Sequence, residues 1–188
     1  MRQNDYDNEC GSISVICGPM FSGKTSELIK RLKKQKNKNY LVFKPEIDDR
    51  YEKDKIVSHD QKKLDAIKIL ESKEILNYIK KDQNIIVGID EAQFFDKNLP
   101  KICNRIANMG NTVIVAGLNM DSDGCPFGPM PFLLAIAENI TTLSSICVKT
   151  GKKAYYTKAI KSKKEQIKIG EKKSYVALCR KEFYKNEK

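Results

Sequence analysis

The sequence predicts an α/β fold, in which a parallel β-sheet is flanked by helices. A glycine-bounded motif, G-x-x-x-x-G-K-[ST], occupies residues 18–25. A short β-rich apolar run at 13–17 precedes it, and residues 26–34 follow it with apolar side chains at helical spacing. A second apolar run, at 85–89, shows no alternation, which is typical of a parallel strand buried on both faces. Strand, phosphate-binding loop and helix therefore stand in the order of a P-loop nucleotide-binding fold.

The character of the chain changes at Cys147. Beyond this point the sequence is rich in Lys and Tyr and short of apolar runs, with two hairpin-like segments around 154–157 and 175–178. We predict two parts, an α/β core that binds nucleotide over residues 10–146 and a small β domain over residues 147–185.

The loop at 18–25 has the residue types that bind a nucleoside triphosphate. Gly18 and Gly23 let backbone N–H groups turn onto phosphate oxygens, and the following helix N-terminus adds partial positive charge. Lys24 is expected to reach the β- and γ-phosphates, and the Thr25 hydroxyl to bind Mg²⁺. The predicted ligands are all eight residues of the loop: Gly18, Pro19, Met20, Phe21, Ser22, Gly23, Lys24 and Thr25.

An acidic pair follows the buried strand at 85–89. Asp90 and Glu91 stand at the tip of the strand, with Gln93 two residues further on. The active crevice of an open α/β sheet lies at the carboxyl ends of its strands. We expect Asp90 to orient the magnesium shell and Glu91 to accept a proton from a hydroxyl nucleophile.

The other elements of the core follow from periodicity and stop signals. They are a strand at 40–44 closed by Pro45, a polar surface loop at 46–60 with an exposed His59, a helix at 71–80 capped by Ser72, a helix at 99–109 stopped by Gly110, a strand at 112–117, a loop at 118–129, a helix at 129–138, a strand from 141 to 144 and an exposed loop at 159–174.

Composition limits the class of protein. At 188 residues the chain is long enough for one α/β domain with a small appendage, and no apolar run reaches the ~18 residues of a membrane span. The polar N-terminal stretch 1–9 lacks the apolar segment of a signal peptide, so we expect a cytoplasmic protein. The six cysteines form no C-x-x-C pair, and we expect no disulfide framework.

Basic residues gather at the C-terminal end. Residues 149–188 hold fourteen Lys/Arg against four Asp/Glu, which is +10 of the net charge of +11. Only five of the 35 basic residues are arginine, the residue that base-edge recognition favours. We interpret this region as a solvated basic surface and do not expect nucleic acid as a partner.

Taken together, these motifs resemble the cytosolic thymidine kinase family of animals and many bacteria, as distinct from the herpesvirus type. The matching residues follow the order of the family through nearly the whole chain. They are 18–25, Asp48, 50–51, 58–60, 90–95, 113–118, 126–128, 137–138, Ala154, Thr157, 169–170, Tyr175 and 179–180.

The resemblance implies ATP-dependent phosphorylation of the 5′-hydroxyl of thymidine, a step of nucleoside salvage for DNA synthesis, with Mg²⁺ as cofactor. The catalytic residues would be Glu91, as the proton acceptor, and Lys24, at the phosphates; ATP would bind the loop at 18–25 with Asp90 and Gln93. Residues around thymidine would be Met20, Arg50, Phe94, Leu118, Phe127, Thr157, Ile167, Lys168, Ile169, Gly170, Glu171 and Tyr175. Those at 167–171 would form a lid that excludes water. The family is usually a homotetramer inhibited by thymidine triphosphate.

The sequence departs from the family at its structural zinc site. The family holds zinc with C-x-x-C and C-x-x-[CH], whereas here Cys147 is followed by Thr150 and Cys179 by Glu182. Tetrahedral structural zinc needs four donors, so we expect zinc to be absent or weakly bound, and Cys147 and Cys179 to lie close together. In the 118–128 loop, Asn119 and Ser122 stand where the family usually has Asp and an aromatic residue.

Two alternatives stay open at this point. Asp-Glu-Ala-Gln at 90–93 resembles a helicase motif, and the basic C-terminus would suit a nucleic-acid-stimulated ATPase; a helicase, however, needs two nucleotide-binding domains. A catalytically impaired homologue would explain the altered zinc ligands. The presence of Lys24, Thr25, Asp90 and Glu91 favours an active enzyme.

Overall fold

A computed structural model describes residues 11–34, 39–47, 55–57, 63–80, 83–160 and 174–185. Its centre is a six-stranded sheet in the order β5-β2-β6-β7-β1-β8, and every neighbouring pair in it is parallel. The strands are β1 (Ser12–Cys17), β2 (Tyr40–Pro45), β5 (Ile67–Ile69), β6 (Ile86–Ile89), β7 (Thr112–Gly117) and β8 (Asn139–Thr142). The predicted α/β fold is confirmed.

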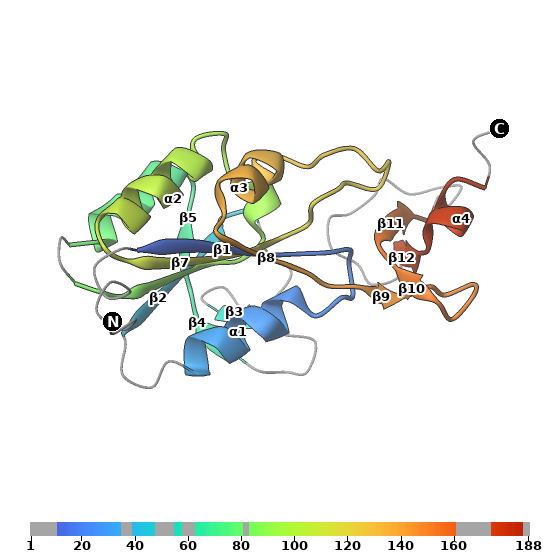
Figure 1. The fold of residues 1–188 in the computed structure, drawn as a ribbon, viewed down its shortest axis with the longest axis horizontal. Helices are drawn as coiled ribbons and strands as arrows, with labels where there is room; N and C mark the ends of the chain where they lie inside the picture. Colours follow the sequence, from blue (N-terminus) through green and yellow to red (C-terminus); the bar gives the residue numbers. More distant parts are fainter. Residues whose placement is uncertain are drawn as a thin grey trace, which may run out of the picture.

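Helices cover both faces of this sheet (Figure 1). α2 (Leu99–Asn108) and α3 (Met130–Ile136) lie on one face, and α1 (Lys24–Lys34) lies on the other. Each face has its own apolar cluster, because buried parallel strands present side chains in both directions.

The central strands are buried for the reason that the sequence suggested. All four residues of β6 are buried, and so are five of the six residues of β7. On one face, Leu28, Ile29 and Leu32 of α1 are fully buried at helical spacing. A Cβ at Gly88 would lie 3.0 Å from Leu32 Cδ1, so the glycine lets α1 pack closely on β6.

The helix expected at 71–80 is a 3₁₀ helix, η1 (Ser72–Tyr78), and Ser72 does not cap it. The backbone N–H and the hydroxyl of Ser72 both donate to Asp96, at 2.6 and 3.0 Å. The cap position belongs to Glu71, whose N–H donates to Glu74 Oε1 at 2.7 Å. Ser72 thus anchors the segment to a distant carboxylate, a contact that local spacing does not show.

The prediction of one loop over 46–60 is wrong in part. β3 (Lys55–Val57) lies within it and pairs antiparallel with β4 (Lys63–Asp65), and β5 follows as the edge strand of the main sheet. These are three-residue strands that mix charged and apolar residues, too short to show a period. His59 lies outside the described residues.

The C-terminal part is small and built from strands. It contains β9 (Ser145–Ile146), β10 (Lys153–Ala154), β11 (Tyr156–Ala159), β12 (Tyr175–Leu178) and α4 (Arg180–Phe183). The two segments predicted as hairpin-like supply β11 and β12, which pair with each other. Figure 1 shows this part at one end of the molecule, beyond the edge of the sheet where β1 ends.

This small unit has its own apolar cluster. Its buried members are Cys147, Ala154, Tyr156, Ala177, Leu178 and Phe183. The rings of Tyr156 and Phe183 stack with centroids 4.7 Å apart, and the Arg180 guanidinium lies 5.1 Å from the Tyr156 ring. Aromatic packing therefore joins α4 to β11.

The buried side-chain amide of Asn111 joins the segments that precede β6 and β7. Asn111 is fully buried just before β7; its Oδ1 accepts from Ile85 N–H at 3.1 Å, and its Nδ2 donates to the Ile106 carbonyl at 3.3 Å.

We predict that Asn111→Leu lowers the free energy of unfolding by about 1–3 kcal/mol, because it leaves buried backbone groups unpaired. Urea denaturation measures the loss, and the exposed Asn98→Leu is the matched control. Equal stability of the two variants would contradict this role.

Candidate functional site

Three strands end side by side at one edge of the sheet. In the parallel register, Cys17 at the end of β1 is opposite Gly117 at the end of β7, and Ile89 at the end of β6 is opposite Val115. The residues that follow are therefore neighbours: the phosphate-binding loop after β1, the acidic pair after β6 and the loop at 118–128 after β7. The parallel order of the three strands therefore brings their carboxyl ends together, as predicted.

The phosphate-binding loop folds back on its own backbone. The Ser22 hydroxyl and the Lys24 ammonium both donate to the Pro19 carbonyl, each at 2.8 Å. Gly18 has a φ of 151°, and a Cβ there would lie 2.5 Å from the Leu143 carbonyl oxygen, so only glycine fits. The loop then enters α1, where Glu27 N–H donates to the Gly23 carbonyl at 3.0 Å.

Thr25 and Asp90 are brought into direct contact. The Thr25 hydroxyl lies 3.0 Å from Asp90 Oδ2 and 3.3 Å from Oδ1, and it donates to this carboxylate. Asp90 is only 5% exposed, and its N–H donates to the Phe43 carbonyl of the neighbouring strand. A hydroxyl and a carboxylate at the N-terminus of α1 are the hard oxygen donors that Mg²⁺ prefers, so these residues fit that metal.

Glu91 adopts a left-handed backbone conformation, with φ 51° and ψ 42°, at the start of the short 3₁₀ helix η2 (Ala92–Phe94). Its carboxylate oxygen Oε2 accepts a hydrogen bond from Gln93 Nε2 at 2.5 Å. Gln93 Oε1 in turn accepts from Leu118 N–H at 2.9 Å. The predicted proton acceptor is thus linked to the start of the 118–128 loop through one buried amide.

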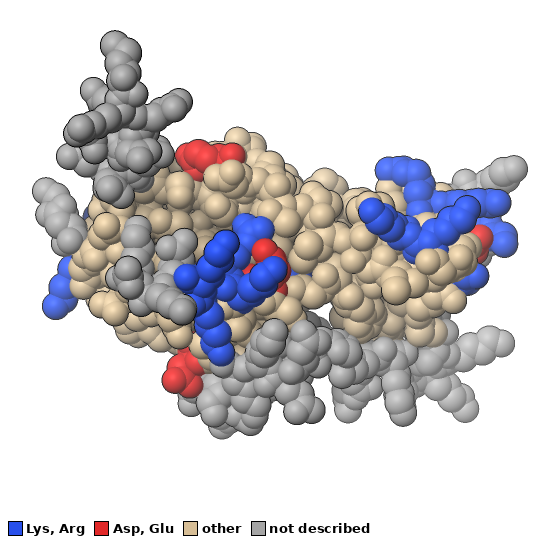
Figure 2. Space-filling view, turned by 60° about the horizontal axis from the view of Figure 1, so that its bottom comes forward, with Lys and Arg blue, Asp and Glu red and all other residues tan. Residues whose placement is uncertain are grey.

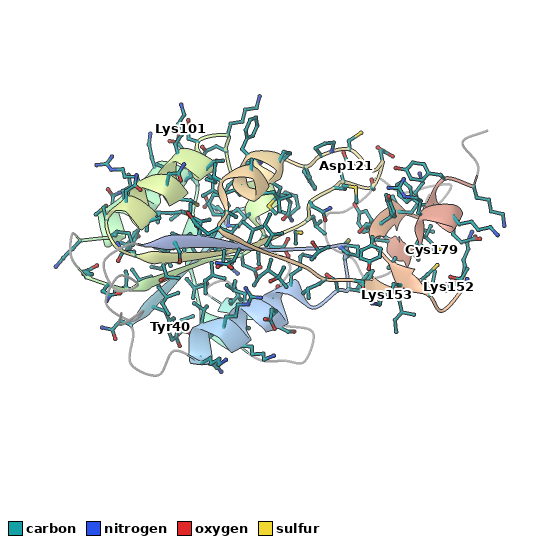
Figure 3. The ribbon with its side chains drawn as sticks, viewed as in Figure 1. Tyr40, Lys101, Asp121, Lys152, Lys153 and Cys179 are labelled. Carbon is teal, nitrogen blue, oxygen red and sulfur yellow. The ribbon has the colours of Figure 1, made fainter. Side chains whose placement is uncertain are left out.

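The 118–128 loop brings an aromatic side chain back to η2. Phe94 and Phe127 meet edge to face with ring centroids 5.5 Å apart. Within the loop, Phe127 N–H donates to the Asn119 carbonyl, and Asp121 Oδ1 accepts from Cys125 N–H at 2.9 Å. Figure 3 shows Asp121 in this loop, between the sheet edge and the small unit.

The small unit reaches the phosphate-binding loop through Thr157. Thr157 is 4% exposed, and its hydroxyl oxygen accepts from Met20 N–H at 2.9 Å. Tyr175 lies on β12 opposite Ala159, two pairs along from the Thr157–Ala177 pair. Arg50 and the lid residues at 167–171 lie outside the described residues, so their contacts with substrate stay predictions.

The sequence analysis did not predict three residues near the acidic pair as site residues: Gly117, Gly128 and Met130. A Cβ at Gly117 would lie 3.0 Å from Gln93 Oε1 and 2.6 Å from Met130 Sδ. Gly128 has a φ of 52°, and a Cβ there would lie 2.2 Å from the Gln93 carbonyl oxygen. The sequence analysis includes the two glycines only within the matching stretches 113–118 and 126–128.

The residues at the family's zinc position do not fit that metal. Cys179 Sγ lies 3.7 Å from the Thr150 hydroxyl, and Glu182 Oε2 pairs with Lys149 and Lys185 at 3.7 and 3.9 Å. Within the part of the chain that the structure describes, no three His, Cys, Asp or Glu side chains form a group that could hold a metal ion. A closed tetrahedral site needs four such donors.

The Cys147 thiol is nevertheless held in a polar setting. Burial opposes its ionisation, but hydrogen bonds from the Thr150 hydroxyl and from the backbone of Cys179, Lys149 and Thr150 outweigh burial and lower the pKa of Cys147 to about 6.

Basic side chains lie over both the core and the small unit (Figure 2). Figure 2 shows Lys and Arg gathered over the small unit, where Lys149, Lys152, Lys153, Lys181 and Lys185 are exposed. Figure 3 places Lys152 and Lys153 near Cys179 at this end.

Across the described residues, none of the helices combines the length and the apolar character that crossing a membrane requires.

Comparison with known proteins gives a consistent set of matches. The family model described as thymidine kinase matches residues 11–183. A thymidine kinase of Bacteroides fragilis is 46% identical over 172 residues, which cover 90% of this chain and 85% of that protein. A thymidine kinase of Onion yellows phytoplasma is 47% identical over 180 residues, covering 91% and 86%. A solved RuvB mutant of Thermogota maritima matches 73% of this chain and 40% of its own, with a TM-score of 0.43 and 14% identity, too weak a likeness for any argument.

The close approach at Gly128 leads to a stability prediction. Gly128→Ala should lower the free energy of unfolding by about 1–2 kcal/mol through its left-handed backbone alone, and further through the contact of the new Cβ with the Gln93 carbonyl. Gly151→Ala is the matched control, because Gly151 has a φ of 69° and no atom within 4 Å of its Cβ position. Chemical denaturation of both variants measures the difference. Equal losses would contradict the packing role.

The lowered pKa of Cys147 leads to a prediction on pH. A thiol whose pKa falls from 9.0 to about 6 on folding stabilises the folded state in full above pH 9, and loses that contribution as the pH falls toward 6. Wild-type stability should therefore rise between pH 6 and 9 by more than that of Cys147→Ser. The exposed Cys125→Ser should keep the wild-type slope. Parallel slopes for Cys147→Ser and wild type in thermal melts would refute the role of the thiolate.

Proposed function

This chain belongs to the thymidine kinase family, and from that premise we propose that its residues transfer the γ-phosphoryl group of ATP to the 5′-hydroxyl of thymidine. The observation that best supports these roles is the contact between Thr25 and Asp90, at 3.0 Å. It joins the phosphate-binding loop to the strand end that bears Glu91. Phosphoryl transfer needs these parts together, because its catalysis consists mainly of positioning and electrostatic stabilisation.

The phosphate end of ATP is assigned to the loop at 18–25. Backbone N–H groups of the loop and the N-terminus of α1 face the phosphates, and the Lys24 ammonium exchanges the Pro19 carbonyl for phosphate oxygens. Thr25 and Asp90 would hold Mg²⁺, which when bound offsets negative charge on the β- and γ-phosphates.

Glu91 is assigned as the general base. Its carboxylate takes the proton of the 5′-hydroxyl as that oxygen bonds to the γ-phosphorus, while the bond from this phosphorus to the β-phosphate oxygen breaks and ADP leaves. The left-handed backbone of Glu91 supports this role, since strained residues cluster at active sites.

Thymidine is assigned to the space bordered by η2, the 118–128 loop and β11. The Phe94–Phe127 pair supplies an apolar surface for the base, and Met20, Leu118 and Thr157 lie on adjoining segments. Arg50, Tyr175 and the lid at 167–171 are proposed to complete the enclosure.

Other properties extend the proposal beyond the chain's own geometry. We propose a cytoplasmic homotetramer in which residues 10–146 form the ATP-binding domain and residues 147–185 the substrate-covering domain. Zinc is proposed to be dispensable, because Thr150 and Glu182 replace two of its donors.

Purified protein with Mg-ATP and a panel of nucleosides tests the function, with products followed by chromatography. We expect thymidine monophosphate, formed at equal rates in metal-free and zinc-supplemented protein. Glu91→Gln should lower kcat by about 10²–10⁴-fold, as loss of a general base does. The matched control is Glu74→Gln, on the distant η1, which should keep wild-type kcat.

Three outcomes would count against the proposal. ADP release only with single-stranded DNA or RNA would indicate a nucleic-acid-stimulated ATPase. Absence of turnover with every nucleoside would indicate an impaired homologue. Wild-type kcat in Glu91→Gln would remove Glu91 from the chemistry while leaving the kinase assignment in place.

A further inference from the structure

Gln93 has both ends of its side-chain amide engaged in the catalytic neighbourhood. The residue is 2% exposed, its Nε2 donates to Glu91 Oε2 at 2.5 Å, and its Oε1 accepts from Leu118 N–H at 2.9 Å. A backbone N–H can only donate and an ionised carboxylate can only accept. The amide therefore has one orientation that satisfies both partners.

Two glycines lie close to Gln93, one beside its side-chain amide and one beside its main-chain carbonyl. Gly117 lies so close that a Cβ would be 3.0 Å from Gln93 Oε1, and Gly128 so close that a Cβ would be 2.2 Å from the Gln93 carbonyl. Gly117 immediately precedes the 118–128 loop, and Gly128 is its last residue. The loop thus lies against Gln93 at both of its ends, beside the side-chain amide at Gly117 and beside the main chain at Gly128.

The same loop is coupled to the proposed base-binding surface. Leu118, which donates to Gln93, begins the loop, and Phe127 near its end contacts Phe94, the residue next to Gln93. The Asn119 carbonyl accepts from Phe127 N–H at 3.2 Å and closes the loop at its base. A change in the loop therefore reaches Gln93 through one hydrogen bond and one ring contact.

We propose that Gln93 is a positioning residue that fixes the direction of the Glu91 carboxylate and links it to the loop that borders thymidine. The proposal rests on the proposed function, because it assigns the geometry of the same base. Glu91 sits in a left-handed conformation that the surrounding structure must stabilise, and the Gln93 amide supplies a charge-assisted hydrogen bond to it. Contact with ATP, expected from the family resemblance, stays a separate prediction for Gln93.

Two substitutions of similar size separate the two hydrogen bonds. Gln93→Met removes both, whereas Gln93→Glu keeps an acceptor for Leu118 N–H and places a second carboxylate against Glu91. We expect kcat to fall about 10–100-fold in both variants, because small misplacements of a reacting group have effects of this size. The KM for thymidine should stay within about threefold of wild type in Gln93→Glu and rise in Gln93→Met.

A double-mutant cycle with Glu91→Gln tests whether Gln93 acts through Glu91. If it does, adding Gln93→Met to Glu91→Gln lowers the residual kcat by less than about threefold, measured with radiolabelled thymidine. Asn111→Leu is the matched control: it also removes a buried amide, but far from the site, and its kcat effect should multiply with that of Glu91→Gln.

Each outcome bears on a different claim. Multiplicative effects of Gln93→Met and Glu91→Gln, or wild-type kcat in Gln93→Glu, would overturn the positioning role while leaving thymidine phosphorylation intact. A wild-type protein without thymidine turnover would overturn the proposed function, and this inference with it.

Discussion

The parallel register of β1, β6 and β7 is the constraint on which the site depends. Thr25 follows β1 and Asp90 follows β6. Their side chains meet at 3.0 Å because the last residues of these strands, Cys17 and Ile89, pair with positions only two residues apart on β7. A slip of one residue moves a strand by about 3.3 Å and turns its side chains to the opposite face. Burial of β6 and β7 on both faces opposes such a slip, so the apolar core also fixes the distances within the candidate site.

Two of the three non-glycine residues with left-handed backbone among the described residues belong to the candidate site: Phe21 in the phosphate-binding loop, with φ 64°, and Glu91, with φ 51°. Each such residue costs about 1–3 kcal/mol and persists only where its surroundings over-determine it. Ser22 and Lys24 bond the Pro19 carbonyl beside Phe21, and Gln93 bonds Glu91. Two of the three strained residues are therefore held by hydrogen bonds within the candidate site.

Much of this arrangement was predictable because its signals are local. The loop at 18–25, its flanking strand and helix, and the acid at the end of an apolar run each occupy a few consecutive residues. β5 and the β3–β4 pair were not predictable, since three-residue strands show no period. The prediction that Ser72 caps a helix was wrong because it used only local sequence. The Ser72 hydroxyl instead donates to Asp96, 24 residues away.

The contacts that specify the site are the least visible in the sequence. Gln93 and Leu118 are 25 residues apart, and Met20 and Thr157 are 137 apart. Neither pair follows from composition or spacing, because each depends on which way one side chain points after the sheet has formed. Gly117 indicates the first only indirectly, because a Cβ there would lie 3.0 Å from Gln93 Oε1.

The small unit is packed around aromatic side chains. Its rings contribute three aromatic pairs, and two cations lie over them. Each pair is worth about 0.5–1.5 kcal/mol, whereas a structural zinc supplies about 10–16 kcal/mol. Two contacts join the unit to the core: Met20 N–H donates to Thr157, and Gly124 of the 118–128 loop lies close to Phe183. The phosphate-binding loop and the 118–128 loop, which both border the candidate site, are therefore also the segments through which the small unit packs on the core.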